Sequence, residues 1–386
     1  MHKDIKPIGV YDTDLDLFES QYVVPEGISY NSFIISDDKI ALIDTVDERK
    51  ADDWCENLYR TLPEGKGPDY LIVQHLEPDH SARIGWVMEK YPECRLVCTT
   101  KARNMLANLV HGPVSFDDRI IEVGDGDTLD LGKHKLHFIT APMVHWPEVM
   151  MVYDETAKTL FSADAFGRFG NPDPDEDWAC EARRYFFNIV GKYGQPVQTV
   201  LKKLAGKEID AIAPLHGPVL EGDIKPYIDL YNTWSSYRVE TPGVLVAHAS
   251  IHGLTAEAAQ YMADLLKEKG ANKVAITDLC RDDQAEAVED AFRMGHLVVL
   301  SSTYDAEIFP PMHHFLHHLA LKGYNNRKVA IVENGMWAPA AGRKMRQMFE
   351  GMKNIEIVEP MITLRGRMTE ENKTALATLA DNLLKA

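Results

Sequence analysis

The sequence lacks several features that would place it outside an ordinary globular enzyme. It has no run of about eighteen apolar residues, so we expect no membrane span. It opens Met1-His2-Lys3-Asp4, without the apolar stretch of a signal peptide. Its five cysteines are odd in number and form no CxxC pair, which is typical of a reducing compartment. We therefore expect a cytoplasmic protein.

Positive charge is also scarce. The chain has 41 Lys and Arg against 59 Asp and Glu, which gives a formal net charge of −18. Such a balance argues against nonspecific binding to nucleic acid or to an anionic membrane. Apolar residues make up 45% of the 386 residues, which is enough for two cores and suggests two domains.

The most informative motif follows the strand-like residues 70–73. Four potential metal ligands fall within six residues there: His75, Glu77, Asp79 and His80. Imidazoles mixed with carboxylates favour iron or manganese over softer ions. An isolated HxExD is as often a solvated polar loop as a metal site.

Three further candidates strengthen the metal interpretation. His145, Asp164 and His216 each come just after a short apolar, strand-like run. One such residue alone is usually a loop or capping residue. Seven ligands, however, are too many for one tetrahedral zinc. They suit two metal ions with one carboxylate shared between them.

Residues 1–240 read as many short strands with a few helices. Residues 29–35 and 39–44 predict a hairpin, and residues 52–62, 82–91, 183–190 and 196–204 predict helices. A second group of strands is expected between residues 120 and 164. This pattern favours an αββα sandwich with the metal ions at one edge of its sheets.

Residues 241–386 alternate strictly between strand and helix. The expected strands are 244–249, 273–278, 297–302, 328–333 and 355–359, and the expected helices are 255–269, 284–294, 312–321, 340–352 and 370–385. Five βα units predict a doubly wound parallel sheet of flavodoxin-like size. Residues 234–242 form the expected junction.

Three loops at the carboxyl ends of these strands are candidates for binding a flavin. The first resembles the SxxGxT phosphate loop of flavodoxins, in which amides at a helix N-terminus face a phosphate. An ordinary helix cap is the alternative. Tyr304 and Trp337 could lie along an isoalloxazine ring, and the absence of GxGxxG argues for FMN rather than a dinucleotide. The candidate residues are Ser250, Ile251, His252, Gly253, Leu254, Thr255, Ser302, Thr303, Tyr304, Asp305, Glu333, Asn334, Gly335, Met336, Trp337 and Ala338.

The series HxExDH, His, Asp, His resembles the ligand set of the metallo-β-lactamase fold. Hydrolases of that fold usually have a second His where this chain has Glu77, and the replacement resembles the flavodiiron proteins, also called A-type flavoproteins. The resemblance covers both domains in the family's order. It implies one iron on His75, Glu77 and His145, another on Asp79, His80 and His216, and a bridge through Asp164. Some family members leave the residue equivalent to His80 uncoordinated.

The resemblance also implies an activity. Two non-haem Fe ions and FMN would reduce O2 to water, NO to N2O, or both. Two ferrous ions and reduced FMN together hold the four electrons that O2 requires. The implied donor is a separate rubredoxin, reduced F420 (F420H2) or another flavoprotein, since the chain has no rubredoxin module of its own. Trp146, Tyr193 and Tyr22 are candidates for the lining of the metal pocket. The family's head-to-tail homodimer, alone or as a dimer of dimers, is expected because FMN of one subunit then faces the iron pair of the other.

Two other functions remain open at this point. One is a zinc-dependent hydrolase of the metallo-β-lactamase fold fused to an electron-transfer flavodoxin domain, in which a metal-bound hydroxide attacks an ester. Glu77 argues against it. The other is an electron carrier whose first domain is only a dimerisation scaffold, and the complete ligand series argues against that.

Overall fold

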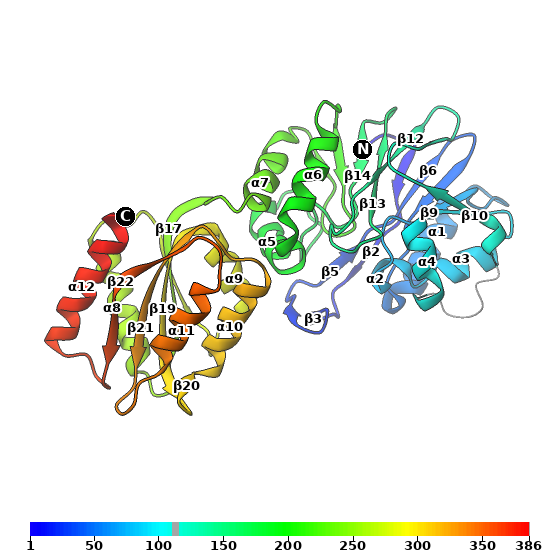
Figure 1. Ribbon diagram of the computed structural model, residues 1–386. Helices are drawn as coiled ribbons and strands as arrows, with labels where there is room; N and C mark the ends of the chain where they lie inside the picture. Colours follow the sequence, from blue (N-terminus) through cyan, green and yellow to red (C-terminus); the bar gives the residue numbers. More distant parts are fainter. Residues whose placement is uncertain (110–115, 386) are drawn as a thin grey trace. The chain divides into compact units, whose positions relative to one another are not determined.

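The computed structural model describes residues 1–109 and 116–385, and it separates into two compact units, Met1–Asn232 and Thr233–Ala386 (Figure 1). Helix α7 (Lys225–Ser235) crosses this boundary, and the first strand of the second unit begins at Thr241. None of the described helices is long and apolar enough to cross a bilayer.

The first unit is a sandwich of two sheets, as expected from the sequence. One sheet has the order β1-β6-β7-β8-β9-β10 and the other the order β11-β12-β13-β14-β15-β16. The strands of the first sheet are Ile5–Pro7, Phe33–Ser36, Ile40–Ile43, Tyr70–Ile72, Arg95–Thr99 and Ile120–Val123. Those of the second are Thr128–Asp130, Lys135–Thr140, Met150–Asp154, Thr159–Phe161, Ala211–Ala213 and Leu220–Glu221.

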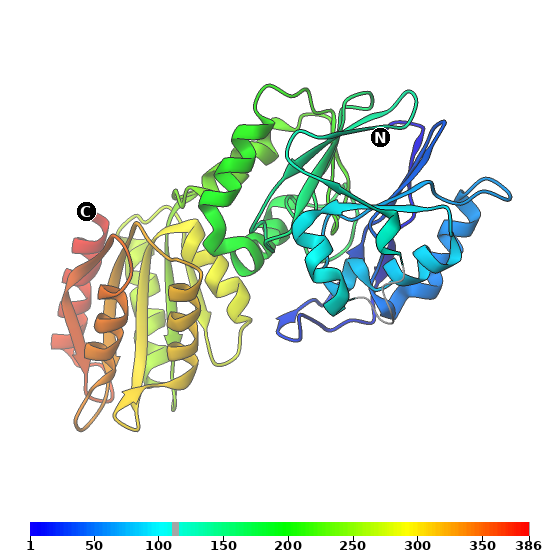
Figure 2. The ribbon, with the colours of Figure 1, turned by 45° about the vertical axis from the view of Figure 1, so that its right-hand side comes forward.

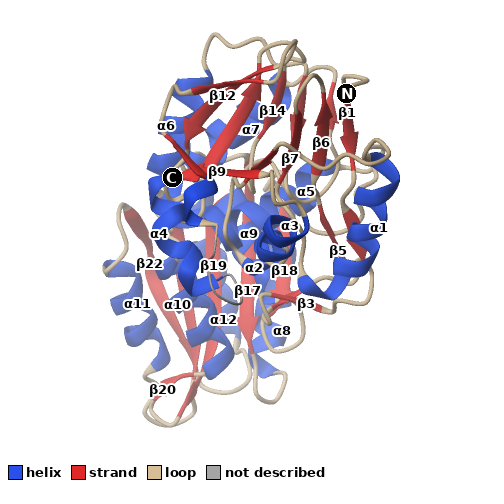
Figure 3. Ribbon diagram, turned by 90° about the vertical axis from the view of Figure 1, so that its right-hand side faces the viewer, coloured by secondary structure: helices blue, strands red, loops and turns tan. Residues whose placement is uncertain are grey.

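The core of this unit lies between the two sheets. Phe33, Ile43 and Ile72 from the first sheet pack with Phe138 and Phe161 from the second, all at most 1% exposed. Helices cover the outer faces (Figure 3): α1 (Ala51–Thr61), α2 (Pro78–Ser81), α3 (Ile84–Lys90), α4 (Thr100–Leu109), α5 (Trp178–Tyr185) and α6 (Gly194–Leu204). Two-stranded pairs complete it: β2 (Val10–Asp12) with β5 (Ile28–Tyr30), and β3 (Leu17–Phe18) with β4 (Tyr22–Val23).

Some sequence expectations for this unit were wrong. The strand at residues 120–123 was grouped with the later strands, but β10 pairs in parallel with β9 in the first sheet. The strand expected at residues 29–35 is interrupted at Asn31 and Ser32, so that β5 and β6 pair with different partners. Helices α4 and α7 were missed.

The second unit is a doubly wound parallel sheet in the order β18-β17-β19-β21-β22, as the sequence predicted (Figure 2). Its strands are Val274–Asp278, Thr241–Ala249, Met294–Tyr304, Arg327–Asn334 and Ile355–Leu364 in that order, and the short β20 (Glu307–Ile308) pairs with β19. Helices α8 (Leu254–Glu268) and α12 (Glu370–Lys385) pack on one face. Helices α9 (Gln284–Arg293), α10 (Pro310–Leu321) and α11 (Ala341–Glu350) contact one another in sequence on the opposite face. This strand order places the ligand-binding loops beyond the carboxyl ends of the strands.

Candidate functional site

The loop after β8 carries the first metal-ligand candidates, and a buried carboxylate holds it in place. Asp44 follows β7, and its Oδ1 accepts hydrogen bonds from the backbone nitrogens of Gln74 at 2.8 Å and His75 at 3.4 Å. The chain then turns into the short helix α2, whose first residue is Pro78. His75 and Glu77 therefore lie in the loop, while Asp79 and His80 project from the helix.

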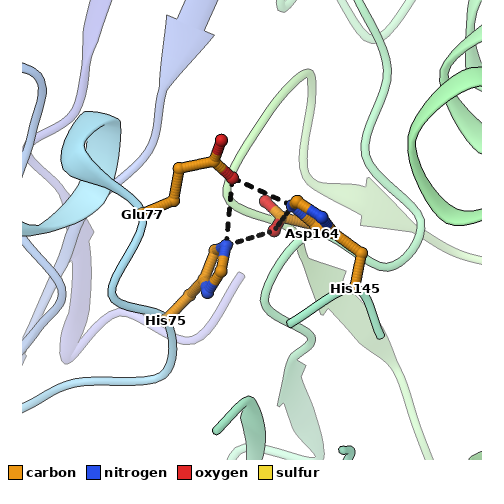
Figure 4. A group of neighbouring side chains, drawn as sticks. All are labelled: His75, Glu77, His145 and Asp164. Atoms are coloured by element: carbon orange, nitrogen blue, oxygen red, sulfur yellow. Dashed lines mark hydrogen bonds and ion pairs between the residues drawn. The ribbon is translucent and has the colours of Figure 1, made fainter. Parts of the chain in front are cut away.

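Four side chains form one group (Figure 4). Nε2 of His75 lies 3.2 Å from Oε2 of Glu77, and Nε2 of His145 lies 2.9 Å from the same oxygen. Both nitrogens also lie 3.3 Å from Oδ2 of Asp164. The three loops that follow β8, β12 and β14 thus bring these ligand atoms to within 4.8 Å of one another.

Three side chains form a second group beside it. Asp79, His80 and His216 also have ligand atoms within 4.8 Å of one another. Oδ2 of Asp79 lies 3.2 Å from Nε2 of His80 and 3.3 Å from Nε2 of His216. The two imidazole nitrogens are 3.1 Å apart. His80 faces the group in the same way as His216 does.

Asp164 connects the two groups. Its Oδ2 faces the first group, whereas its Oδ1 lies 3.4 Å from Nε2 of His80 and 3.6 Å from Nε2 of His216. The residue is 1% exposed. One carboxylate therefore presents one oxygen to each group, which is the arrangement of a bridging ligand.

The donors and acceptors at this site fit cations rather than hydrogen bonds. Nδ1 of His75 donates to Oε1 of Glu148 at 2.8 Å, and Nδ1 of His216 donates to the carbonyl of Ser29 at 2.7 Å. Their Nε2 atoms therefore present lone pairs to carboxylates. Within the described residues, neither oxygen of Asp79 or Asp164 has a hydrogen bond of normal geometry. Buried acceptors that converge without donors are costly unless positive charge lies between them.

The pKa shifts of His75 and Asp164 also indicate that the buried carboxylates favour positive charge beside them. Burial disfavours a charged His75, but the carboxylates of Asp164, Glu148 and Glu77 together outweigh burial and hold the pKa of His75 well above its usual range. Burial likewise opposes ionisation of Asp164, yet His75 and the neighbouring imidazoles hold its pKa well below the ordinary value. Without a metal ion, protons on the imidazoles would balance the carboxylates.

Aromatic rings cover the site, although not all those predicted. The Trp146 ring lies 5.1 Å from the His75 ring, centroid to centroid. Tyr22 instead donates its hydroxyl to the carbonyl of Asn188 at 3.0 Å. Tyr193 precedes α6, and the Lys192 ammonium lies 5.2 Å from the centroid of its ring. The rings of Phe18 and Tyr185 lie beside the second group, with centroids 5.4 and 5.7 Å from that of His216.

A pocket of about 390 Å³ lies beyond the carboxyl ends of the strands in the second unit. Its lining includes most of the predicted flavin-binding residues: Ser250, Ile251, His252, Leu254, Thr255, Ser302, Thr303, Asp305, Asn334, Gly335, Met336, Trp337 and Ala338. Ala306 and Gly366 also line it and were missed.

Three predicted residues do not line this pocket. The Glu333 carboxylate accepts hydrogen bonds from the Gly342 nitrogen and the Thr363 hydroxyl, both at 2.8 Å, so it holds α11 against the sheet. Tyr304 packs against Phe309 at 5.7 Å. Gly253 serves the loop through its backbone, with a φ of 87° that favours glycine and a nitrogen that donates to Oγ of Ser250 at 3.0 Å.

The pocket combines hydroxyl groups with an exposed apolar rim. Oγ1 of Thr255 lies 3.0 Å from Oγ of Ser302, and Thr255 is the second residue of α8. Trp337 is 81% exposed and Met336 67% exposed. A helix N-terminus with hydroxyls suits a phosphate, and an exposed indole suits one face of a planar ring.

Sequence reasoning missed Glu148, Asp44 and Tyr185 at the metal site. Glu148 also accepts a hydrogen bond from the Leu76 nitrogen at 3.0 Å, so it holds both the ring and the backbone of the loop. The only signal for it was its place three residues after His145. Asp44 offered a better signal, because it ends an apolar strand as Asp164 does.

Comparisons with known proteins agree with this geometry. Residues 28–217 match the model of a family described as ODP family beta lactamase. The chain is 32% identical over 285 residues to "Putative diflavin flavoprotein A 1" of Thermosynechococcus vestitus, and 28% identical over 337 residues to an anaerobic nitric oxide reductase flavorubredoxin of Salmonella arizonae. These matches cover 71% and 84% of this chain.

Two solved structures share the fold over the whole chain. Rubredoxin oxygen:oxidoreductase from Desulfovibrio gigas has a TM-score of 0.92 at 21% identity and covers 100% of this chain and 97% of its own. The flavodiiron protein from Giardia intestinalis has a TM-score of 0.92 at 24% identity and covers 100% and 95%. The chain therefore has the same fold as these two proteins. It spans about half the length of the diflavin flavoprotein relative from Thermosynechococcus vestitus, 48%, and 69% of the length of the Salmonella arizonae relative.

Proposed function

We propose that this chain is a flavodiiron oxidoreductase that reduces O2 to water, NO to N2O, or both. The reaction takes place at a non-haem diiron site in the first unit, and FMN in the second unit delivers the electrons. The relatives named above as a nitric oxide reductase and a rubredoxin oxygen oxidoreductase support both substrates.

The observation that carries the proposal is the position of Asp164 between two ligand groups. A single metal would leave one of its oxygens and one of the groups without a partner. The donor set is carboxylate-rich and has no thiolate, which favours iron over zinc at this site. Glu77 in the first group contributes to that preference.

The seven ligand candidates and their neighbours would have distinct roles. His75, Glu77 and His145 would hold one iron, Asp79, His80 and His216 the other, and Asp164 both. Such an iron pair supplies one-electron redox chemistry and a place for a diatomic gas to bind. Glu148 keeps Nε2 of His75 aimed at the site, and the Trp146 ring limits access of water to it.

The second unit would bind FMN in the pocket beyond the strand ends. Ser250, Thr255 and the first amides of α8 suit its phosphate, and the loop after β21 suits its ring. The volume of the pocket, about 390 Å³, lies within the range of small-molecule and cofactor sites.

Electrons would come from a separate protein or cofactor. Rubredoxin is the donor that the name of the Desulfovibrio gigas protein indicates, while F420H2 and another flavoprotein are the alternatives. We also propose a head-to-tail homodimer, or a dimer of such dimers, in the cytoplasm. No nucleic acid or membrane partner is proposed, because the net charge is −18.

A zinc-dependent hydrolase is a weaker interpretation. It leaves the flavin-type pocket without a role, and the named relatives are flavoproteins and a reductase.

The first test is the metal and flavin content of protein purified without oxygen, followed by stopped-flow mixing of the reduced form with O2 or NO. The expected result is about two irons and one FMN per chain, with flavin reoxidation far faster than that of free FMN. Two zincs per chain, or a flavin that reoxidises at the rate of free FMN, would refute the proposal.

A pair of variants separates the two cofactors. His216→Ala removes a ligand of the second group and should lower iron content and reoxidation rate while FMN remains. His252→Ala alters only the flavin pocket wall, so iron should stay at two per chain.

A further inference from the structure

A third cluster of metal-ligand side chains lies in the first unit, apart from the seven residues above. His2, Asp4 and His134 have ligand atoms that all lie within 4.8 Å of one another. Nδ1 of His2 and Nε2 of His134 lie 3.7 and 3.5 Å from the same oxygen of Asp4. The two imidazole rings meet edge to face with centroids 5.1 Å apart.

His134 is held in a fixed orientation by buried groups. Its Nδ1 donates to Oδ2 of Asp154 at 2.6 Å, and Asp154 is fully buried. Its backbone nitrogen donates to Oδ2 of Asp37 at 2.7 Å. A carboxylate behind the far nitrogen of an imidazole is the arrangement that orients histidine ligands of metal ions.

The other nitrogen of this ring points into the cluster without a hydrogen bond. His134 is 1% exposed, and within the described residues its Nε2 has no hydrogen-bond partner. Because the Nδ1 proton is given to Asp154, Nε2 presents a lone pair to the Asp4 carboxylate, which is also an acceptor. The lone pair of the buried His134 Nε2 thus faces the partly exposed Asp4 carboxylate, and a cation between these two acceptors would satisfy both.

We propose that His2, Asp4 and His134 form a separate site for one divalent transition-metal ion, with Zn²⁺ the favoured occupant. Two imidazoles and one carboxylate match the ligands that zinc takes, and water can fill the fourth position. The proposal does not rest on the redox function, since it uses none of the same residues.

The topology gives this site a structural role. Asp4 precedes β1, the edge strand of the first sheet, and His134 lies between β11 and β12 at the edge of the second. A bound ion would therefore tie the edges of the two sheets together and hold the chain's first residues in place.

The site also lies far from the diiron candidate. His134 precedes β12 and His145 follows it, so the six residues of that strand separate the two sites. At roughly 3.3 Å per residue this is about 20 Å. An ion at one site therefore makes no direct contact with the other.

The test uses the holoprotein with its iron and flavin. The protein is incubated with Zn²⁺, desalted, and analysed for zinc per chain and for Tm by calorimetry. His2→Ala and Asp4→Asn should each bind one zinc fewer than the wild type, with iron and FMN unchanged. Zinc should raise the Tm of the first unit by roughly 5 °C in the wild type but not in these two variants.

The variants and control are chosen to keep the fold intact. The His2 and Asp4 side chains are 34% and 26% exposed, so their replacement opens no core cavity. The control is His137→Ala. His137 lies on β12, its ring contacts the Glu155 carboxylate, and it is outside the cluster, so this variant should keep both the bound zinc and the Tm shift.

The test compares the zinc content of the variants with that of the wild type, because imidazoles outside the cluster also bind zinc. His313 and His317 are stacked on the exposed face of α10, with ring centroids 6.3 Å apart. They add equally to the zinc content of every variant. Equal zinc content in His2→Ala, Asp4→Asn and wild type would overturn the proposal, whatever the iron site does.

Discussion

Glu148 accepts a hydrogen bond from Nδ1 of His75 at 2.8 Å, and this contact decides which nitrogen of His75 faces the carboxylates of the metal site. Both residues are fully or almost fully buried. Because the same oxygen of Glu148 also receives the Leu76 amide, the ring and the loop that carries it are fixed together. Glu148 is thus a positioning residue, although the ligand pattern of the sequence does not include it.

Replacement of Glu148 by alanine should weaken iron binding by about 10- to 100-fold, the range seen for partners of metal-bound histidines. Glu148→Gln retains an acceptor and should lose less. The measurement is iron retained per chain against a graded series of chelator concentrations. Glu155→Ala, an exposed glutamate on the same sheet, is the control. Equal retention in Glu148→Ala and wild type would contradict the assignment.

Replacement of Asp164 by asparagine should affect both metal positions at once. The amide cannot present a charged oxygen to each group, so the iron content should fall well below two per chain and turnover by more than about 100-fold, whereas FMN content should not change. Asp175→Asn changes an exposed carboxylate in the same unit and should behave as wild type. A loss confined to one iron would show that Asp164 does not bridge.

The flavin pocket gives a separate prediction at Thr255. Thr255→Val removes the hydroxyl that lies 3.0 Å from Ser302, and a lost hydrogen bond to a charged phosphate should weaken FMN binding by roughly tenfold or more. Fluorescence titration of flavin-free protein with FMN measures the Kd. Thr374→Val on the exposed face of α12 serves as the matched change. If FMN binds both variants equally, the phosphate lies elsewhere.

Acid should destabilise the second unit through His318 on α10. Burial lowers the pKa of His318 to about 4, and His314, Lys322 and His317 add to the effect. The folded pKa is below the ordinary value of about 6.5, so the unfolded state binds the proton more tightly and stability falls as the pH drops from about 6.5 towards 4.

His318→Gln should remove part of this dependence. Urea unfolding of the holoprotein followed at several pH values between about 7 and 4.5 should show a smaller loss in the variant than in the wild type. His313→Gln, on the exposed side of the same helix, should keep the wild-type slope. A slope that is identical in all three proteins would refute the role of His318.

The alternating strands and helices of the second unit were predictable, because each strand and helix carries its own periodic pattern of buried apolar residues. The five strands of the parallel sheet and the five helices of the second unit lie where the periodicity predicts them, within about five residues at their ends, and only the two-residue β20 has no counterpart in the prediction for this described unit. The sandwich was predicted as a class, but strand membership was not. Whether β10 pairs with β9 or with β11 depends on tertiary packing. The four residues of β10 carry no periodic pattern that would indicate its partner.

The candidate sites show the same division. Histidines and carboxylates after apolar strands are chemically distinctive, and the structure brings all seven metal-ligand candidates together. The Tyr185 ring reaches His216 from α5, a contact between distant parts of the chain that no local pattern indicates. Glu148 contacts a residue 73 positions away, so no local pattern could have indicated it.

Asp164 divides its two oxygens between the two ligand groups, and this makes the groups one thermodynamic system. An ion at either position alters the charge and freedom of the carboxylate that the other position needs, and the coupling must be equal in both directions. The affinity of one position for a metal ion therefore has a defined value only when it is stated whether the other position holds an ion. The identity of the first metal acquired also conditions the choice of the second.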